Sequence, residues 1–192
     1  MYFKNLYDER IEPNSDFLVQ HSYFSNLTGV SRGGAIYNDA NININVEECL
    51  FTFCSCTDRG GAIYANQGEF FIQKSCFIKN SANLNSDFQC SPKNNIESEI
   101  TVVFGTTILH SLWNSGTESL YIKNLNSSYA KLENSILYYG VLLTVKAPFN
   151  HSIKFLQCSN STGNKALFSS EYTVTTKIDH VNLINNENSN YN

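Results

Sequence analysis

The sequence is poor in charge, in proline and in long hydrophobic runs. Charged residues make up 16% of the 192 residues, the formal net charge is −4, and there are 3 prolines and 1 methionine. A basic face of the kind that binds nucleic acid is therefore not expected. The longest apolar runs, such as residues 141–145, are too short to cross a bilayer, so no transmembrane segment is expected in this chain. The residues after Met1 are polar and charged where a signal peptide needs an apolar stretch, and we expect no signal peptide.

Asparagine and aromatic residues are abundant instead. The chain has 26 asparagines, and aromatic residues make up 13% of it. Asparagine and serine side chains compete for backbone hydrogen bonds inside a helix, whereas Phe, Tyr, Ile, Val and Thr favour strands. The composition therefore predicts an all-β protein with many turns.

A repeat is visible when the sequence is compared with itself. Residues 19–37 align without a gap on residues 46–64, and RGGAIY at 32–37 recurs at 59–64. Six identical residues at a fixed offset of 27 indicate a structural repeat. A looser pattern of apolar, small and turn residues continues beyond these two copies. The predicted repeats start at Val19, Val46, Ile72, Val103, Leu132, Ile153 and Ile178.

These repeats predict a right-handed parallel β-helix of about seven coils. One repeat cannot bury its own apolar side, but stacking equivalent strands about 4.8 Å apart pairs each backbone with the coils above and below. A β-sandwich is the competing fold, and it does not require a 27-residue repeat. We expect an N-terminal cap or lead-in at 1–18, repeats over 19–186 with an inserted loop near 83–98, and a flexible tail at 187–192.

Three structural roles follow from this stacking. Apolar side chains should form ladders inside the coils, glycines should allow bends, and asparagines should occupy left-handed turn positions. The residues assigned to these roles are Phe24, Phe51, Phe77, Ile36 and Ile63 for the ladders, Gly33, Gly34, Gly60 and Gly61 for the bends, and Asn80 and Asn186 for the turns.

Tyr37 and Tyr64 are the candidate binding residues. If Ile36 and Ile63 point inward, alternation along a strand places both tyrosines outside, one above the other. Two exposed aromatic rings form a contact strip for a sugar or a protein. The same pair could instead only stabilise the sheet.

The best candidate for catalysis is a cluster of Glu48 and Asp58 with Arg32 and Arg59. Cleavage of polysaccharides uses clustered carboxylates as acid and base or as calcium ligands, often beside an arginine or lysine. The alternative is that Asp58 is a surface ion-pair partner between two stacked arginines. No carboxylate pair recurs on adjacent repeats, so an enzyme is the less favoured interpretation.

Histidine and cysteine show no spacing typical of a metal site. The four histidines lie in different repeats and are expected at surfaces or edges. Cys54 and Cys56 are expected as small core residues, since buried cysteine behaves as a small hydrophobe. Cys49 and Cys76 occupy nearly equivalent strand positions, where they could stack or form a disulfide. No metal and no cofactor are predicted.

The GGAIY motif beside an F-x-x-N motif resembles the repeats of the polymorphic membrane protein family. GGAIY stands at 33–37 and 60–64, F-x-x-N stands at 77–80, and the resemblance covers residues 19 to about 83. It implies a right-handed β-helix with a pectin-lyase-like fold, located at the cell surface or outside the cell and acting in adhesion. We therefore expect a non-catalytic surface module, or a truncated copy of one, that recognises a cell-surface glycan or protein. The alternative is a polysaccharide lyase or hydrolase of the pectate-lyase-like class, and the oligomeric state is left open.

Overall fold

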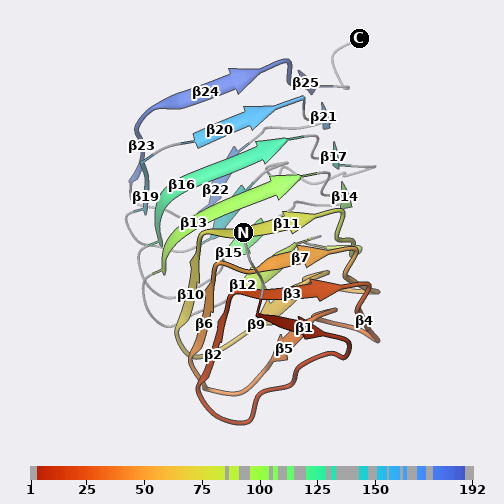
Figure 1. Ribbon diagram of the computed structural model, residues 1–192. Helices are drawn as coiled ribbons and strands as arrows, with labels where there is room; N and C mark the ends of the chain where they lie inside the picture. The colour runs from red at the N-terminus through yellow and green to blue at the C-terminus, as the bar shows by residue number, and fades with distance from the viewer. Residues whose placement is uncertain are drawn as a thin grey trace.

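The computed structural model describes residues 4–84, 87–90, 96–103, 106–107, 112–114, 120–128, 131–132, 143–146, 151–154, 156–160, 162–163, 168–171 and 175–188. Over these residues the protein is all-β, without a helix, and every strand pairing in its named sheets is parallel (Figure 1). None of the described residues forms a helix that is long and apolar enough to span a membrane.

The strands form five sheets. The 10-stranded sheet contains β1 (Asn5–Tyr7), β3 (Ser22–Ser25), β7 (Leu50–Thr52), β11 (Ser75–Ile78), β13 (Ile96–Val103), β16 (Leu120–Ser128), β19 (His151–Ile153), β20 (Leu156–Ser159), β23 (Thr176–Ile178) and β24 (Val181–Ile184). The 6-stranded sheet contains β5 (Ile36–Asn38), β9 (Ile63–Ala65), β12 (Phe88–Cys90), β15 (Leu112–Asn114), β18 (Leu143–Lys146) and β22 (Phe168–Glu171).

Three smaller sheets complete the described strands. The 3-stranded sheet contains β2 (Phe17–Gln20), β6 (Ile44–Glu47) and β10 (Phe70–Gln73). The 4-stranded sheet contains β14 (Thr106–Thr107), β17 (Lys131–Leu132), β21 (Thr162–Gly163) and β25 (Glu187–Asn188), and the 2-stranded sheet contains β4 (Thr28–Gly29) and β8 (Ser55–Cys56).

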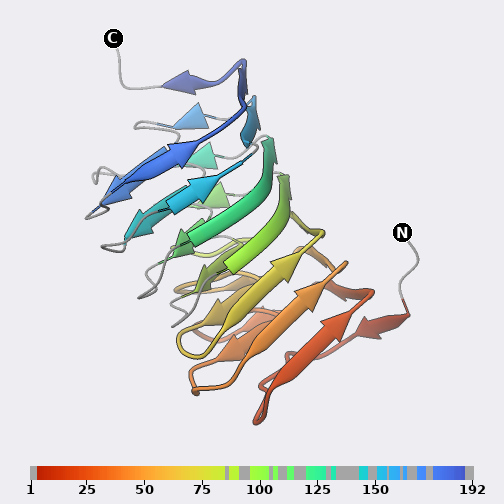
Figure 2. The ribbon, with the colours of Figure 1, turned by 90° about the vertical axis from the view of Figure 1, so that its left-hand side faces the viewer.

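In each repeat, the chain adds a strand to a sheet next to the strand that the preceding repeat contributed to it. Phe24 of β3 lies next to Phe51 of β7, which lies next to Phe77 of β11, although 27 and 26 residues separate them along the chain. We call each such passage of the chain a layer. Figure 2 shows the layers stacked in sequence order, from the red strands at the N-terminal end to the blue strands at the C-terminal end. Each strand thus satisfies its backbone groups with the layer before and the layer after it.

The corners between strands use left-handed backbone conformations at equivalent positions. His21, Glu48 and Lys74 have φ angles of 46°, 50° and 48°, and each joins a strand of the 3-stranded sheet to one of the 10-stranded sheet. The next residue of each layer is small and buried, and its side chain donates a hydrogen bond to the carbonyl oxygen two residues earlier. These bonds run from Ser22 to Gln20 (2.7 Å), from Cys49 to Glu47 (3.2 Å) and from Ser75 to Gln73 (3.0 Å).

An aromatic ladder fills the interior, as the sequence predicts. The rings of Phe24 and Phe51 stack with centroids 4.6 Å apart, and those of Phe51 and Phe77 stack at 5.0 Å. Tyr7 extends the ladder at the N-terminal end, 4.6 Å from Phe24. All three phenylalanines have no exposed surface, so the ladder is the centre of the described core.

Gly33, Gly34 and Gly60 behave as expected of bend glycines. Ile36 and Ile63 are register partners in the interior. Gly33 and Gly60 have φ angles of +58° and +64°, which L-residues with a side chain rarely adopt. A Cβ on Gly34 would lie 2.2 Å from the carbonyl oxygen of Gly61, so the layers approach too closely there for any other residue.

Asn80 and Asn186 are not the left-handed residues at their turns, contrary to the prediction. Lys79 (φ 54°) and Asn185 (φ 50°), one residue earlier in each case, adopt that conformation. Asn80 instead turns into the core and is 1% exposed. Its Oδ1 accepts a hydrogen bond from the backbone N–H of Cys54 at 2.9 Å.

The predicted loop near 83–98 contains part of the sheets. Phe88 of β12 is the register partner of Ile63 and is 5% exposed. The carbonyl oxygen of Asp87 accepts hydrogen bonds from the backbone N–H groups of Ala62 and Ile63, as that of Ala62 does from Ala35 and Ile36. Residues 87–88 are thus a third copy of Ala-Ile in which neither side chain is kept, which explains why the sequence comparison missed it.

The repeat starts predicted at Val103 and Leu132 are displaced. Val102 is the register partner of Phe77, which makes Val103 the end of its strand, and the next strand of this sheet is β16. Leu132 lies in β17 of the 4-stranded sheet, whereas the first three predicted starts lie in the 3-stranded sheet. Residues 133–142, which carry most of the predicted repeat at Leu132, lie outside the described residues. Ile153 and Ile178 are register partners of each other, in agreement with the predicted starts.

The two ends of the described stack differ. At the N-terminal end, β1 pairs with β3 and Ile11 bridges to Ile36, so residues before 19 cover part of the first layer. At the C-terminal end, Val181 and Leu183 of β24 are 50% and 53% exposed. Two residues of the predicted tail form β25, which pairs with β21, and residues 189–192 lie outside the described part.

Candidate functional site

Two arginine–tyrosine pairs lie side by side in the first layers. The rings of Tyr37 and Tyr64 are stacked, with centroids 5.7 Å apart and an interplanar angle of 16°. The guanidinium carbon of Arg10 lies 4.6 Å from the centroid of Tyr37, and that of Arg32 lies 4.9 Å from the centroid of Tyr64. Each guanidinium therefore makes a cation–π contact with a ring of the layer that follows it.

Tyr64 is buried, which corrects the expectation of two exposed rings. Its exposed fraction is 3%, whereas Tyr37 is half-buried. Besides lying over the ring, Arg32 donates a hydrogen bond from Nη1 to the hydroxyl oxygen of Tyr64 at 3.0 Å. Burial raises the pKa of Tyr64. Alternation along the strand places both tyrosine side chains on its outer face, but Arg32 of the neighbouring layer then covers the ring of Tyr64.

Asp58 lies between two arginines of adjacent layers. Its Oδ2 is 3.5 Å from Nε of Arg32, and its Oδ1 is 3.4 Å from Nε of Arg59. Arg32 and Arg59 are themselves bridge partners, so their like charges are brought together by the repeat. Asp58 reduces that repulsion, which agrees with the ion-pair alternative for this residue.

Glu48 lies at a different corner of the layer and is engaged there. Its Oε2 is 3.1 Å from Nδ1 of His21, and its Oε1 is 3.4 Å from Nζ of Lys74. Glu48 precedes β7, whereas Asp58 follows β8. The four residues of the candidate catalytic cluster are thus divided, with Asp58, Arg32 and Arg59 in one network and Glu48 in another.

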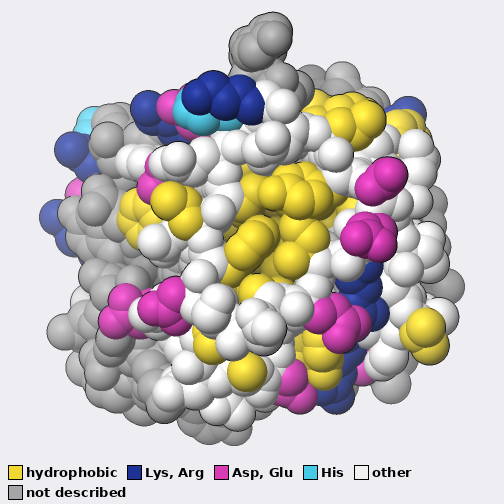
Figure 3. All heavy atoms as spheres, turned by 60° about the horizontal axis from the view of Figure 1, so that its bottom comes forward, with side chains coloured by type: hydrophobic (Ala, Val, Ile, Leu, Met, Phe, Trp, Pro, Cys, Tyr) yellow, Lys and Arg dark blue, Asp and Glu magenta, His cyan; other side chains and the backbone are white. Residues whose placement is uncertain are grey.

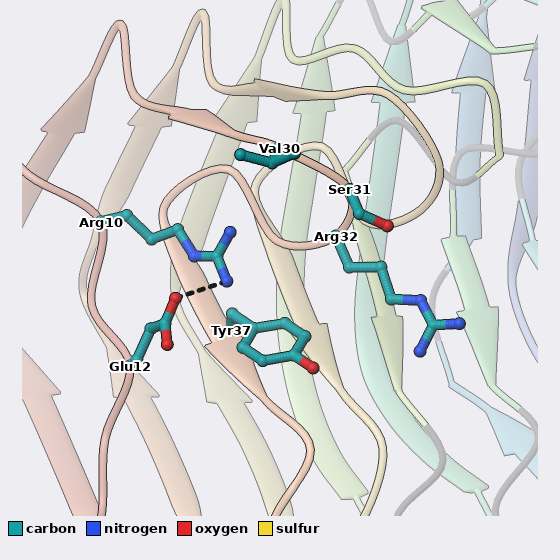
Figure 4. A pocket seen from close by; sticks show the side chains of 6 residues that line it. All are labelled: Arg10, Glu12, Val30, Ser31, Arg32 and Tyr37. Atoms are coloured by element: carbon teal, nitrogen blue, oxygen red, sulfur yellow. Dashed lines mark ion pairs between the residues drawn. The ribbon is translucent and has the colours of Figure 1, made fainter.

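A hollow of about 360 Å³ opens beside Tyr37 (Figure 4). It is lined by Arg10, Glu12, Val30, Ser31, Arg32 and Tyr37. Arg10 and Glu12 lie on one side of Tyr37 and Arg32 lies on the other, with its guanidinium group turned away from Arg10 (Figure 4). Figure 3 shows this end of the molecule, where acidic and basic side chains flank an exposed hydrophobic area.

The charges in this hollow are only partly compensated. Nη2 of Arg10 pairs with Oε1 of Glu12 at 2.6 Å, and the Glu12 side chain is 63% exposed. Nε of Arg10 is buried and has no hydrogen-bond partner. Within the described residues, Nη2 of Arg32 also makes no hydrogen bond or ion pair. Among the described residues, the Arg10 guanidinium group thus forms an ion pair only with the exposed Glu12 carboxylate, and Arg32 keeps one unpaired donor, Nη2.

Sequence reasoning missed four of the six lining residues. Arg10 and Glu12 precede the repeat, and Val30 and Ser31 differ between its copies, so none of them carries a repeat signal. One signal was available: Ile11 has the same role as Ile36 and Ile63, because it bridges to Ile36. Aligning Ile11 with those residues would have placed Glu12 beside Tyr37 and Arg10 beside Ala35, and so would have brought both lining residues to this strand.

The cysteines have a structural role in the first layers. Cys49, Cys54 and Cys56 are buried and free, and Cys76 is half-buried and free. Cys49 lies beside Ser75, because the backbone N–H of Cys49 donates a hydrogen bond to Oγ of Ser75 at 3.2 Å. Cys76 is instead the register partner of Leu50. The expected Cys49–Cys76 equivalence is therefore displaced by one residue.

Metal ligands are not grouped in the part of the chain that the structure describes, where no three His, Cys, Asp or Glu side chains could share an ion. His21 pairs with Glu48 at a corner, and His180 is exposed, as expected of edge histidines. His110 and the side chain of His151 lie outside the described part.

Comparison with known proteins found no matching family model, no matching curated protein and no matching solved structure.

Proposed function

We propose that the protein is a non-catalytic recognition module that binds a glycan or a protein at the cell surface or outside the cell. In this proposal the chain forms a right-handed parallel β-helix of about seven coils and is a member, or a truncated copy, of the polymorphic membrane protein repeat family. The recognition surface is the hollow beside Tyr37 together with the adjacent outer face of the first layers.

One observation carries the binding part of the proposal. The hollow combines a guanidinium group that is paired only with an exposed carboxylate, the unpaired Nη2 of Arg32 and a half-buried aromatic edge, and polar groups beside an aromatic side chain are typical of ligand sites. The parallel strands, the offsets of 26 and 27 residues and the aromatic ladder support the β-helix. The cell-surface assignment is supported by the motif resemblance at 33–37, 60–64 and 77–80.

The polysaccharide lyase or hydrolase alternative has less support. Two carboxylates that act as acid and base must flank one bond, at separations of about 5 to 10 Å. Glu48 and Asp58 lie at different corners, and each is engaged by cationic side chains. The geometry therefore favours binding over cleavage.

Retention of the purified chain on a panel of glycans, extracellular proteins and intact cells tests the proposal, with eluted sugars checked for shortened chains. We expect retention without shortening. Tyr37→Ser should weaken it, and Tyr23→Ser, which changes a half-buried tyrosine of the 10-stranded sheet, is the matched control. Failure to bind any of the three kinds of ligand would overturn the proposal. Shortened sugars would overturn its non-catalytic part, and Glu48→Gln and Asp58→Asn would then identify the catalytic group.

A further inference from the structure

We propose that the hollow between Arg10 and Arg32 binds the anionic group of an acidic sugar. The inference rests on the proposed recognition function and names the class of ligand for it. The ligand is a glycan that carries a carboxylate or sulfate group. Its anionic group takes the place of the Glu12 carboxylate on Arg10, and its ring lies in the hollow beside Val30 and Ser31, with Nη2 of Arg32 as a further donor to the sugar.

Arg10 is held by a partner that a ligand can replace. Its buried Nε is out of reach of a ligand in the hollow, whereas its Nη2 is engaged only by Glu12, whose side chain is 63% exposed. An exposed ion pair contributes about 0 to 1 kcal/mol, so another anion can replace the Glu12 carboxylate at small cost. Glu12 therefore shows where a ligand oxyanion would sit, because guanidinium groups bind carboxylates and related oxyanions in the same forked geometry.

Arg32 also lines the hollow, and its guanidinium group is held in place by other residues. Its Nε and Nη1 are engaged by Asp58 and Tyr64, which fix the orientation of the guanidinium group. Within the described residues its Nη2 is left without a partner. A donor held in place by its own neighbours loses little conformational freedom when a ligand binds. Arg32 thus supplies a pre-positioned donor for another oxygen of the sugar.

The rest of the lining favours a sugar over an acidic peptide. The volume of about 360 Å³ is within the usual range for small-molecule sites. The hydroxyl groups of Ser31 and Tyr37 are lining groups that can donate and accept, as sugar hydroxyls require. The side chain of Val30, 86% exposed, offers an apolar contact for the C–H groups of a ring.

The charge of the whole chain makes this inference specific. The formal net charge is −4, so a polyanion is not attracted to the protein as a whole. Binding of an acidic glycan would therefore have to arise from local groups, and the hollow contributes two arginines against one glutamate.

The test measures affinity of the full chain for three polysaccharides, and for polyglutamate as an acidic polypeptide, at two salt concentrations. Hyaluronan carries carboxylates only, dextran sulfate carries sulfates only, and dextran is neutral. We expect Arg10→Gln to weaken binding of the acidic polymers tenfold or more, because a hydrogen bond to a charged group is lost. Glu12→Gln should tighten binding about two- to fivefold, since it removes the competing carboxylate. Lys74→Gln removes the same charge from an exposed corner and should leave the affinity unchanged.

Glu12→Gln keeps the test decisive if an arginine variant does not fold, because a loss of packing cannot tighten binding. Arginine-dependent binding of hyaluronan alone, of dextran sulfate alone or of both supports the inference and identifies the anion. Binding of dextran or another neutral glycan, unchanged by these variants, would overturn the inference and leave the recognition function standing. Binding of polyglutamate but of no acidic glycan would overturn the sugar class. Binding of none of these polymers overturns the inference, whereas the recognition function is overturned only if the panel of glycans, extracellular proteins and cells also shows no retention.

Discussion

Asn80 donates a hydrogen bond from Nδ2 to Oδ1 of Asp87, 3.1 Å away, although the two residues are only 1% and 0% exposed. The same Nδ2 lies 3.3 Å from the carbonyl oxygen of Phe51, and Oδ1 accepts from the backbone N–H of Cys54. One side chain therefore joins the layer of β7 to the segment that leads into β12. The F-x-x-N motif thus ends in a buried polar bridge between layers.

Asn80→Leu should lower the free energy of unfolding by about 2 to 4 kcal/mol, because it leaves the N–H of Cys54 and the carboxyl group of Asp87 without these partners. Asn66→Ala is the control, since the bond of Asn66 to Asp39 at 2.7 Å lies at the surface, and a change below about 1 kcal/mol is expected. Urea denaturation measures both. Equal effects of the two substitutions would contradict the buried bridge.

Phe51 and Phe53 form a matched pair, because they are two residues apart and differ in burial. Phe51 has no exposed surface and stacks between Phe24 and Phe77, whereas Phe53 is 51% exposed. Phe51→Ala should cost about 3 to 5 kcal/mol in stability through the cavity that it leaves. Phe53→Ala should cost less than about 1 kcal/mol, the usual size of the contact that Lys79 makes at 5.5 Å. Thermal and urea unfolding should rank the two variants in this order, and the reverse order would contradict the ladder.

The buried thiols predict a loss of stability at high pH. Burial raises the pKa of Cys49 and of Cys54 to about 11. An unfolded thiol loses its proton near pH 8.5, so above that pH the unfolded state binds fewer protons than the folded state. The two thiols therefore leave the free energy of unfolding unchanged below about pH 8.5. Between pH 8.5 and 11 each of them lowers it, by on the order of 2 to 3 kcal/mol.

The double variant Cys49→Ala/Cys54→Ala isolates this effect from the titration of tyrosine and lysine, which both proteins share. Urea midpoints measured from pH 7 to 10.5 should fall more steeply in the parent protein than in the variant. Parallel pH profiles would show that the thiols do not carry the dependence.

The hydroxyl group of Tyr64 should matter more than that of Tyr37. The hydroxyl oxygen of Tyr64, a buried residue, accepts a hydrogen bond from Arg32 at 3.0 Å. The hydroxyl group of Tyr37 instead donates a long hydrogen bond of 3.4 Å to Asp39 at the surface. Tyr64→Phe should lower the free energy of unfolding by about 1 to 3 kcal/mol, the range for a bond to a charged group, and Tyr37→Phe should have an effect below about 0.5 kcal/mol. Denaturation of the two variants under identical conditions measures the difference, and similar losses would contradict the asymmetry between the two rings.

The sequence by itself determined the register of the first two layers. An offset of 27 residues places Phe24 over Phe51 and Ile36 over Ile63, because parallel strands in register stack equivalent positions directly on one another. The left-handed glycines at 33 and 60 followed from the same repeat, since only glycine adopts that conformation without a steric cost.

Only the tertiary structure decided where the later layers lie and what surrounds Tyr37. Beyond β11 the strands keep their pairing but not their residue types, so Phe77 meets Val102 and Ile63 meets Phe88 without a repeated letter to mark the position. The corners decided the rest. The corners place Glu48 and Asp58 in separate ion-pair networks. They also bring Arg10 over Tyr37 and Arg32 over Tyr64. How far a corner side chain extends into the next layer depends on its conformation, which the spacing of residues along the chain does not specify.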